Sequence, residues 1–388
     1  MKKKLVVALL SLTLVGTLLM GCGGNGGDTT TDDTTTETAD NGGDDGAADA
    51  DTNDAPAGGG ENIQIVSKGF QHQFWQAVLQ GAEEAAEELG VTINFVGPNS
   101  ESDIADQVQM FQNAINQHPA AIGLAALDTE ALLDGIAQAQ AEGIPIIGFD
   151  SGVPDAPAGS ILANASTDNY AAGQLAANEG WNAGIRDRVV NANGSVRIGV
   201  LSQDATSESI INRGLGFIDQ IATLVEAEGL TVSITGNTRY VNDSAVEETG
   251  EGGDVIIEVL VPSQVTNELS AIDMQTLLNK EDTIVIYGSN QHSGEAMVTG
   301  NATIQRLGVG ADDVLGIAFD SGATIKQAIR DQLFMGAVTQ APVAMGQAVV
   351  QLAVAAARGE TVSDVDTGAQ WYTADTIDNP EIYQNLYD

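Results

Sequence analysis

Residues 61–96 read ENIQIVSKGFQHQFWQAVLQGAEEAAEELGVTINFV, and the fold can be argued from this segment. Its runs at 63–66 and 92–96 are short and rich in β-branched residues, which predicts two strands. Between them, residues 74–89 have apolar side chains at helical spacing, and Gly90 ends the helix. Four glutamates fall on its outward face: Glu83, Glu84, Glu87 and Glu88. A strand, a helix and a strand in this order predict parallel strands with a right-handed crossover.

The same alternation continues to the end of the chain. In the first half it predicts helices at 103–116 and 129–142 and strands at 121–124 and 146–149. In the second half it predicts strands at 196–201, 283–287, 314–319 and 335–338, and helices at 207–228, 292–307, 321–331 and 341–358. Residues 241–266 fit less well and are interpreted as an insertion. The fold class is therefore α/β, with two doubly wound parallel sheets and a ligand cleft beyond the carboxyl ends of their strands.

The composition excludes some classes of function. The 388 residues hold 14 Lys and Arg against 54 Asp and Glu, which gives a formal net charge of −40. A protein that binds nucleic acid needs clustered cations, so we expect no nucleic-acid partner. The single cysteine allows neither an intrachain disulfide nor a cysteine-based metal site.

The first 22 residues are typical of an export signal. Three lysines at positions 2–4 precede an apolar run at 5–20, which is shorter than a membrane-spanning helix. The run ends in Leu19-Met20-Gly21-Cys22, which resembles the lipobox of bacterial lipoproteins. That resemblance implies a lipid on Cys22 and an extracytoplasmic protein anchored to the cell membrane; an uncleaved anchor is the alternative. Residues 23–60 contain ten Gly, ten acidic residues and no Lys or Arg, which predicts a disordered acidic tether.

Polar side chains follow several of the predicted strands. They are Asp150, Asn290, Asp320 and Gln340, and Arg213 lies near the start of the helix at 207–228. Carboxylate, amide and guanidinium groups are planar and offer paired donors or acceptors, which match the neighbouring hydroxyls of a sugar. Phe74 and Trp75 add aromatic surface for the apolar face of a pyranose ring. Since these groups come from both sheets, both halves must close on the ligand.

Seven sequence blocks in the right order carry a resemblance that covers residues 61 to about 372. The chain resembles the ribose/galactose-type periplasmic sugar-binding proteins, which are the substrate receptors of ABC importers. The blocks are Phe74-Trp75, IPIIGFD at 144–150, ASTDN at 165–169, NRGLGF at 212–217, Gly288-Ser289-Asn290, GIAFD at 316–320 and Val338-Thr339-Gln340.

The resemblance implies a fold and a set of site residues. The fold is that of type I periplasmic binding proteins, with lobe one at 61–167 and 341–370, lobe two at 168–340 and 371–388, and a multi-strand hinge. His72 and Ser151 stand where ribose binders carry Asn and Arg, so ribose is not assumed. Phe74 and Trp75 match the aromatic pair that holds the sugar ring, and Tyr240 matches an aromatic on the opposite wall. Five residues match positions that bond sugar hydroxyls: Asp150, Arg213, Asn290, Asp320 and Gln340.

The implied function is capture of a monosaccharide by a monomer and its delivery to an ABC permease, with no cofactor. One alternative is a receptor for a furanose signal or a polyol that feeds a sensor, and another is a carbohydrate-active enzyme. Against an enzyme, the histidines at 72, 118 and 292 lack metal-ligand spacing, and neither a nucleophile elbow nor a phosphate loop occurs in the sequence. We therefore expect neither a catalytic nor a metal site. Sugar-sensing repressors share the implied fold but need a DNA-binding headpiece, and the export signal stands in its place.

Each site residue also has a purely structural interpretation. Asp150 and Asp320 are suited to cap the turns after their strands. Arg213 could be a surface residue of its helix, Trp75 a core residue, and His72 a solvated loop residue. Asp168 and Asn169 are expected to cap the following helix rather than to touch the ligand.

Overall fold

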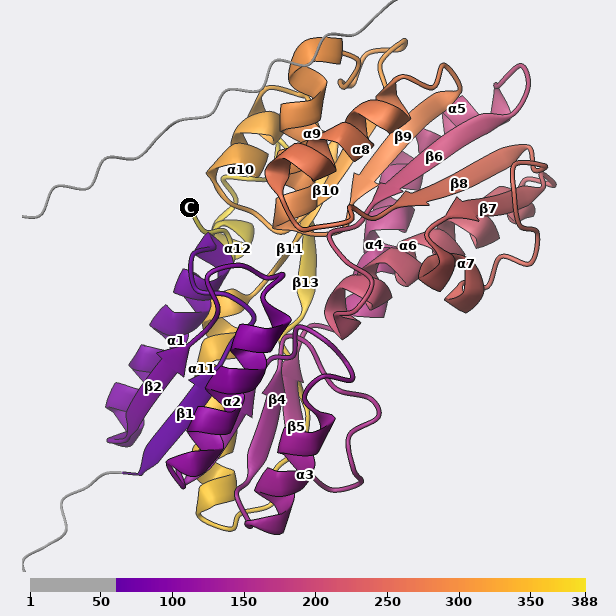
Figure 1. Ribbon diagram of the computed structural model, residues 1–388. Helices are drawn as coiled ribbons and strands as arrows, with labels where there is room; N and C mark the ends of the chain where they lie inside the picture. The colour runs from indigo at the N-terminus through magenta and orange to yellow at the C-terminus, as the bar shows by residue number, and fades with distance from the viewer. Residues whose placement is uncertain (1–60) are drawn as a thin grey trace, which may run out of the picture. The chain divides into compact units, whose positions relative to one another are not determined.

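The computed structural model describes residues 61–388, and these residues form two sheets with helices on both faces (Figure 1). The predicted signal peptide, the tether and the lipobox residue Cys22 lie outside the described residues. Within 61–388, none of the helices has the length and apolar character that crossing a bilayer requires.

The first sheet is parallel throughout and has the strand order β12-β5-β4-β3-β1-β2. Its strands are β1 (Asn62–Val66), β2 (Thr92–Val96), β3 (Ala121–Leu124), β4 (Ile146–Phe149), β5 (Ile161–Ser166) and β12 (Val365–Asp366). Alternate residues of a strand point to opposite faces, so two cores form. One face packs against α1 (Gln73–Leu89) and α11 (Pro342–Ala357), and the other packs against α2 (Ile104–Asn116) and α3 (Leu133–Ala141).

The helices α1 and α11 approach each other closely because glycine lies at their contact. A Cβ atom on Gly81 would lie 1.9 Å from the carbonyl oxygen of Val343, and one on Gly346 would lie 1.9 Å from that of Val78. The contact fixes α1, whose first turn carries the aromatic pair Phe74-Trp75, against α11.

The second sheet has the order β13-β11-β10-β9-β6-β8-β7, with β13 antiparallel to β11 and the other pairs parallel. Its strands are β6 (Val196–Leu201), β7 (Val232–Gly236), β8 (Val255–Leu260), β9 (Thr283–Gly288), β10 (Leu315–Phe319), β11 (Gly336–Gln340) and β13 (Ala369–Tyr372). One face is covered by α4 (Asn169–Gly180), the π-helical turn Trp181–Ile185, α5 (Arg186–Val190) and α6 (Glu208–Ala227). The other is covered by α8 (Asn267–Leu278), α9 (Gln291–Ile304) and α10 (Ala323–Arg330), and α12 (Pro380–Tyr383) lies near the end of the chain.

Residues 241–266 are not an insertion, which corrects the interpretation of the sequence. Strand β8 lies within this segment and pairs with β6 and β7 inside the second sheet. The connection from β7 to β8 holds only the short helix α7 (Thr238–Asp243) and a Gly/Glu-rich loop. Because no full crossover helix separates the two strands, the strand–helix alternation is interrupted there.

The chain passes between the two sheets three times: from β5 to α4, from β11 to α11, and from β12 to β13. The crossings lie between Ser166 and Asn169, between Gln340 and Pro342, and between Asp366 and Ala369. Below, lobe one denotes the segments that build the first sheet with its helices, and lobe two denotes those that build the second sheet with its helices.

Candidate functional site

A cavity between the lobes gathers eight of the nine ligand residues proposed from the sequence. The carboxyl ends of the strands in both sheets meet there, as expected for doubly wound sheets. Lobe one contributes the loop and helix after β1 and the residue after β4, while lobe two contributes α6 and the ends of β9, β10 and β11. The eight residues are His72, Phe74, Trp75, Asp150, Arg213, Asn290, Asp320 and Gln340.

Asp150 and Asp320 occupy matching positions in the two lobes. Each directly follows its strand and adopts a left-handed backbone conformation, with φ of 55° and 72°. Asp tolerates this conformation better than most residues, which explains its use in these turns. Both side chains are buried on the cavity wall, so the same residue ends the strand and supplies the carboxylate.

Arg213 lies between these two carboxylates and is almost completely buried. Its guanidinium nitrogens are 3.5 Å from Asp320 Oδ2 and 3.8 Å from Asp150 Oδ1, and its Nε donates to Asn169 Oδ1 at 2.7 Å. The guanidinium also stacks 4.3 Å from the ring centre of Phe319. The interpretation of Arg213 as a surface residue is therefore wrong. Asn169, expected only to cap a helix, holds the arginine in place, whereas Asp168 caps α4 by accepting from the Ala171 amide.

Asp320 is held by several donors besides Arg213. Gln340 Nε2 donates to its Oδ1 at 2.6 Å, and the backbone amide of Gln291 donates to its Oδ2 at 3.1 Å. Burial raises the pKa of Asp320, and the positive charge of Arg213 and the Gln340 hydrogen bond oppose that rise. These protein groups thus fix the orientation of the carboxylate.

The aromatic pair on α1 forms the apolar part of the wall. Phe74 and Trp75 meet edge to face with 5.0 Å between ring centres, and Trp75 meets Phe149 edge to face at 6.2 Å. The indole Nε1 of Trp75 donates to Glu101 Oε1 at 2.7 Å. Trp75 is therefore both a core residue and a cavity residue.

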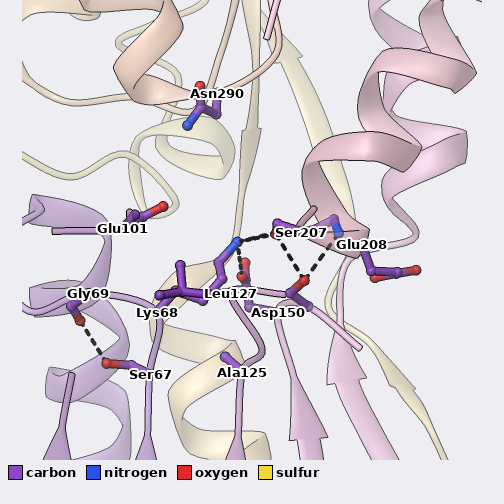
Figure 2. Close-up of polar contacts among 12 residues, drawn as sticks. Ser67, Lys68, Gly69, Glu101, Ala125, Leu127, Asp150, Ser207, Glu208 and Asn290 are labelled. Atoms are coloured by element: carbon purple, nitrogen blue, oxygen red, sulfur yellow. Dashed lines mark hydrogen bonds and ion pairs between the residues drawn. The ribbon is translucent and has the colours of Figure 1, made fainter. Parts of the chain in front are cut away.

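Lys68 is a site residue that the sequence reasoning missed. Its Nζ lies 3.0 Å from Asp150 Oδ2 and donates to Ser207 Oγ of lobe two at 3.1 Å (Figure 2). It also donates to Ser209 Oγ of lobe two at 3.0 Å. Burial disfavours its charge, but Asp150 and Glu101 outweigh burial and raise the pKa of Lys68. Its signal was present in the sequence, because Lys68 lies two residues beyond β1, at the strand end that faces the cleft.

Glu101 and Gln203 were also missed. They follow β2 and β6, and Gln203 Nε2 donates to Glu101 Oε2 at 3.0 Å across the two lobes. Burial disfavours the Glu101 carboxylate, yet Lys68, His72 and the hydrogen bonds from Gln203 and Trp75 lower its pKa to about 2. Glu101 is therefore ionised at neutral pH.

Tyr240 is not on the cavity wall, which corrects its proposed role. The side chain is completely buried in the core of lobe two, where its ring packs beside Gly214. Its hydroxyl shares a 2.7 Å hydrogen bond with Ser202 Oγ and also bonds the backbone oxygens of Asp204 and Ile210. A tyrosine satisfied in this way supports the fold rather than the ligand.

His72 and His292 line the cavity from opposite lobes. His292 is buried, and its Nε2 lies 2.9 Å from Ser270 Oγ. Burial, with a smaller contribution from His72, lowers the pKa of His292 to about 4. The folded protein therefore holds this imidazole in its neutral form at pH values where an exposed histidine is already protonated.

His292 should make the folded protein sensitive to acid. Between pH 6.5 and 4 the unfolded chain binds a proton on this histidine and the folded chain does not, so stability falls as the pH is lowered. The difference corresponds to about 3 kcal/mol of unfolding free energy at pH 4. Urea unfolding of wild type and His292→Gln across this range checks the prediction. The gap between the two proteins should change with pH, and parallel curves would contradict it.

Among residues 61–388, the structure contains no group of three or more His, Cys, Asp or Glu side chains arranged to hold a metal ion. What the described cavity offers is a set of oriented hydrogen-bonding groups: two carboxylates, a guanidinium, an ammonium and several amides. Such a set binds a polar molecule with many hydroxyl groups.

The chain was compared with known proteins and solved structures. A structure from Brachyspira murdochii, titled ABC transporter, LacI family transcriptional regulator, is 34% identical, with a TM-score of 0.70 over 85% of this chain and 99% of that one. A carbohydrate transporter solute binding protein from Agrobacterium radiobacter, solved with D-arabinose, is 25% identical, with a TM-score of 0.69 over 84% of this chain and 99% of that one. These matches confirm the predicted two-lobed α/β fold.

The D-allose-binding periplasmic protein of Escherichia coli (strain K12) is 29% identical over 146 residues. The match covers 34% of this chain and spans about half, 47%, of that relative. The periplasmic binding protein domain, in turn, matches residues 63–361, well over half of the chain. The chain therefore belongs to the periplasmic binding protein domain family, whose members are solute-binding proteins rather than enzymes.

Proposed function

We propose that this protein is an extracytoplasmic receptor that captures a monosaccharide between its lobes and delivers it to an ABC permease. A lipid on Cys22 would hold it at the cell membrane, and the acidic segment 23–60 would serve as its tether. The similar proteins support the ligand class, since one is named for D-allose and others were solved with D-arabinose and D-fucose.

One observation carries the proposal. Three buried side-chain oxygens on the cavity wall accept no hydrogen bond from residues 61–388: Asp150 Oδ2, Gln291 Oε1 and Gln340 Oε1. Asp150 Oδ2 has Lys68 as an ionic neighbour, but the contact lacks the alignment of a hydrogen bond. Buried acceptors are normally satisfied, and the hydroxyl groups of a sugar are donors that can satisfy them.

Binding requires the lobes to move. The space left between the described cavity side chains is about 30 Å³, far less than a ligand pocket usually encloses. Lys68 and Ser151 of lobe one bond lobe two directly, so a sugar must replace or rearrange part of this contact. A sugar that contacts both lobes would favour a closed form, which the permease could then recognise.

A panel of sugars tests the proposal. D-allose, D-arabinose, D-fucose, D-ribose, D-galactose and D-glucose are tested by thermal shift and calorimetry. At 100 times its dissociation constant, a bound sugar should add about 2.7 kcal/mol to the unfolding free energy.

The Tyr240→Phe variant serves as a control, because Tyr240 lies in the core of lobe two, and it should select the same sugar with the same affinity as wild type. Failure of every sugar to bind would contradict the proposal. If none of the six sugars binds but a polyol added to the same panel does, the protein belongs to the alternative class of receptor.

A further inference from the structure

Three cavities in the described structure meet at one side chain, Glu101. The first is the interlobe cavity proposed to hold the sugar. The second, of about 230 Å³, lies beside it and is here called the outer cavity; it shares Glu101, His72 and His292 with the first. The third, of about 630 Å³, runs along the loop at 261–266. Glu101 therefore lies at the boundary between the sugar cavity and two larger spaces.

A chain of hydrogen bonds crosses the cleft at this boundary. Trp75 Nε1 donates to Glu101 Oε1 at 2.7 Å, Gln203 Nε2 donates to Glu101 Oε2 at 3.0 Å, and Asn290 Nδ2 donates to Gln203 Oε1 at 2.7 Å. Trp75 and Glu101 belong to lobe one, whereas Gln203 and Asn290 belong to lobe two. The two ends of the chain, Trp75 and Asn290, both line the sugar cavity. When the lobes are in contact, these bonds thus form a wall on one side of that cavity.

The wall is built from strong bonds. Because the pKa of Glu101 is about 2, both of its oxygens accept as a carboxylate, and charge-assisted hydrogen bonds are stronger than neutral ones. Gln203 is almost completely buried, and its Nε2 is also 3.2 Å from Asp204 Oδ2. Removing Gln203 would open the wall while leaving the bond between Trp75 and Glu101 in place.

The outer cavity is suited to a second polar ring. Apart from the shared residues and Val265, its lining is made of amide and hydroxyl side chains: Gln71, Asn99, Ser100, Gln203 and Asn267. These groups donate and accept hydrogen bonds as sugar hydroxyls require. The outer cavity, on the far side of the wall from the sugar cavity, thus has the volume and the hydrogen-bonding groups to accept the substituent of a glycoside.

We infer that the hydrogen bond between Glu101 and Gln203 limits the receptor to free monosaccharides, and that the outer cavity is a closed-off subsite for the substituent of a glycoside. The inference rests on the proposed function and adds to it the size limit of the ligand and the residues that set it. Specificity here comes from a barrier against the larger ligand as well as from contacts with the smaller one.

The test compares wild type with Gln203→Ala by calorimetry. The probes are the six sugars of the panel above, each with its methyl and phenyl glycosides in both anomeric forms. For the sugar that binds, wild type should bind the glycosides at least 100-fold more weakly than the free sugar. In Gln203→Ala this ratio should fall at least 10-fold, with most of the change in the glycoside affinity. Gln327→Ala, an exposed glutamine on α10, is the matched control and should keep the wild-type ratio.

Three other outcomes are possible, and each contradicts a different part of the inference or of the proposed function. An unchanged ratio in Gln203→Ala overturns the role of the wall, even if both affinities fall together. Wild type that binds a glycoside as tightly as the free sugar overturns the size limit and leaves the monosaccharide receptor standing. Failure of all free sugars and glycosides to bind either protein contradicts the proposed function itself, and the size limit fails with it.

Discussion

Replacing Arg213 with methionine is expected to lower the free energy of unfolding by about 3–5 kcal/mol, because it leaves the buried carboxylate of Asp320 without its cation and leaves Asp150 with Lys68 alone. The guanidinium faces Asp150 and Asp320 from between them, and it gives its Nε hydrogen to Asn169. Methionine keeps much of the length and apolar contact with Phe319 but carries no charge. Sugar binding should be lost in the same variant, since Arg213 lines the cavity between the two carboxylates and its paired donors are removed.

Urea unfolding at neutral pH measures this loss. Arg186→Met is the matched control, because Arg186 makes a two-pronged ion pair with Glu228 on the exposed surface of lobe two. Exposed ion pairs contribute little to stability, so this variant should unfold close to wild type. If both variants lose the same small amount, Arg213 is not the buried partner of the two carboxylates.

The elements that the sequence predicted are confirmed, because their periods are unambiguous, whereas β5, α4, β7 and α8 were not predicted. The predicted strands at 92–96, 121–124, 146–149 and 196–201 have the observed bounds, and the long helices differ from prediction by one to three residues at either end in most cases. Short buried parallel strands flanked by turns, and helices with one apolar face, are the patterns that local sequence encodes most directly. The segment at 241–266 failed because a six-residue helix and a loop replace the usual crossover there.

The lining of the cavity was predicted at those strand ends that the sequence analysis inspected. Asp150, Asn290, Asp320 and Gln340 follow their strands and lie together on the cavity wall. The same rule applied to β1, β2 and β6 points to Lys68, Glu101 and Gln203, which were overlooked although they lie within five residues of a strand end. Their partners could not be predicted, because the contact of Lys68 with Ser207 joins residues 139 positions apart in the chain.

Tyr240 was predicted to contact the ligand, but it lies in the core of lobe two. Its position beside a segment of uncertain form gave no indication of which way the ring points, and the structure buries it against Gly214 rather than at the cleft. A residue type that suits a ligand also suits a core, and only the packing around it decides between the two.

Replacing Asp320 with alanine is expected to weaken sugar binding at least 30-fold. The carboxylate accepts from Gln340 and from the Gln291 amide, and it faces Arg213 at 3.5 Å, so its loss frees three donors that were oriented toward the cavity. Truncating one partner of a buried, hydrogen-bonded charge pair typically costs about 2–5 kcal/mol of binding free energy. Calorimetry with whichever of D-allose, D-arabinose and D-fucose binds wild type gives the ratio directly.

Two variants of Trp75 distinguish the contribution of the Asp320 charge to sugar affinity from the contribution of the aromatic wall. Trp75→Ala should also weaken binding because it removes the aromatic wall and the donor to Glu101, whereas Trp75→Phe should restore much of the loss by returning the ring. Glu83→Ala, on the exposed face of α1, should leave the affinity unchanged. If Asp320→Ala binds as tightly as Glu83→Ala, the carboxylate does not touch the sugar. The binding site must then lie outside the cavity that Arg213, Asp150 and Asp320 line. A ligand bound inside this cavity would lose affinity when the charge of Asp320 is removed.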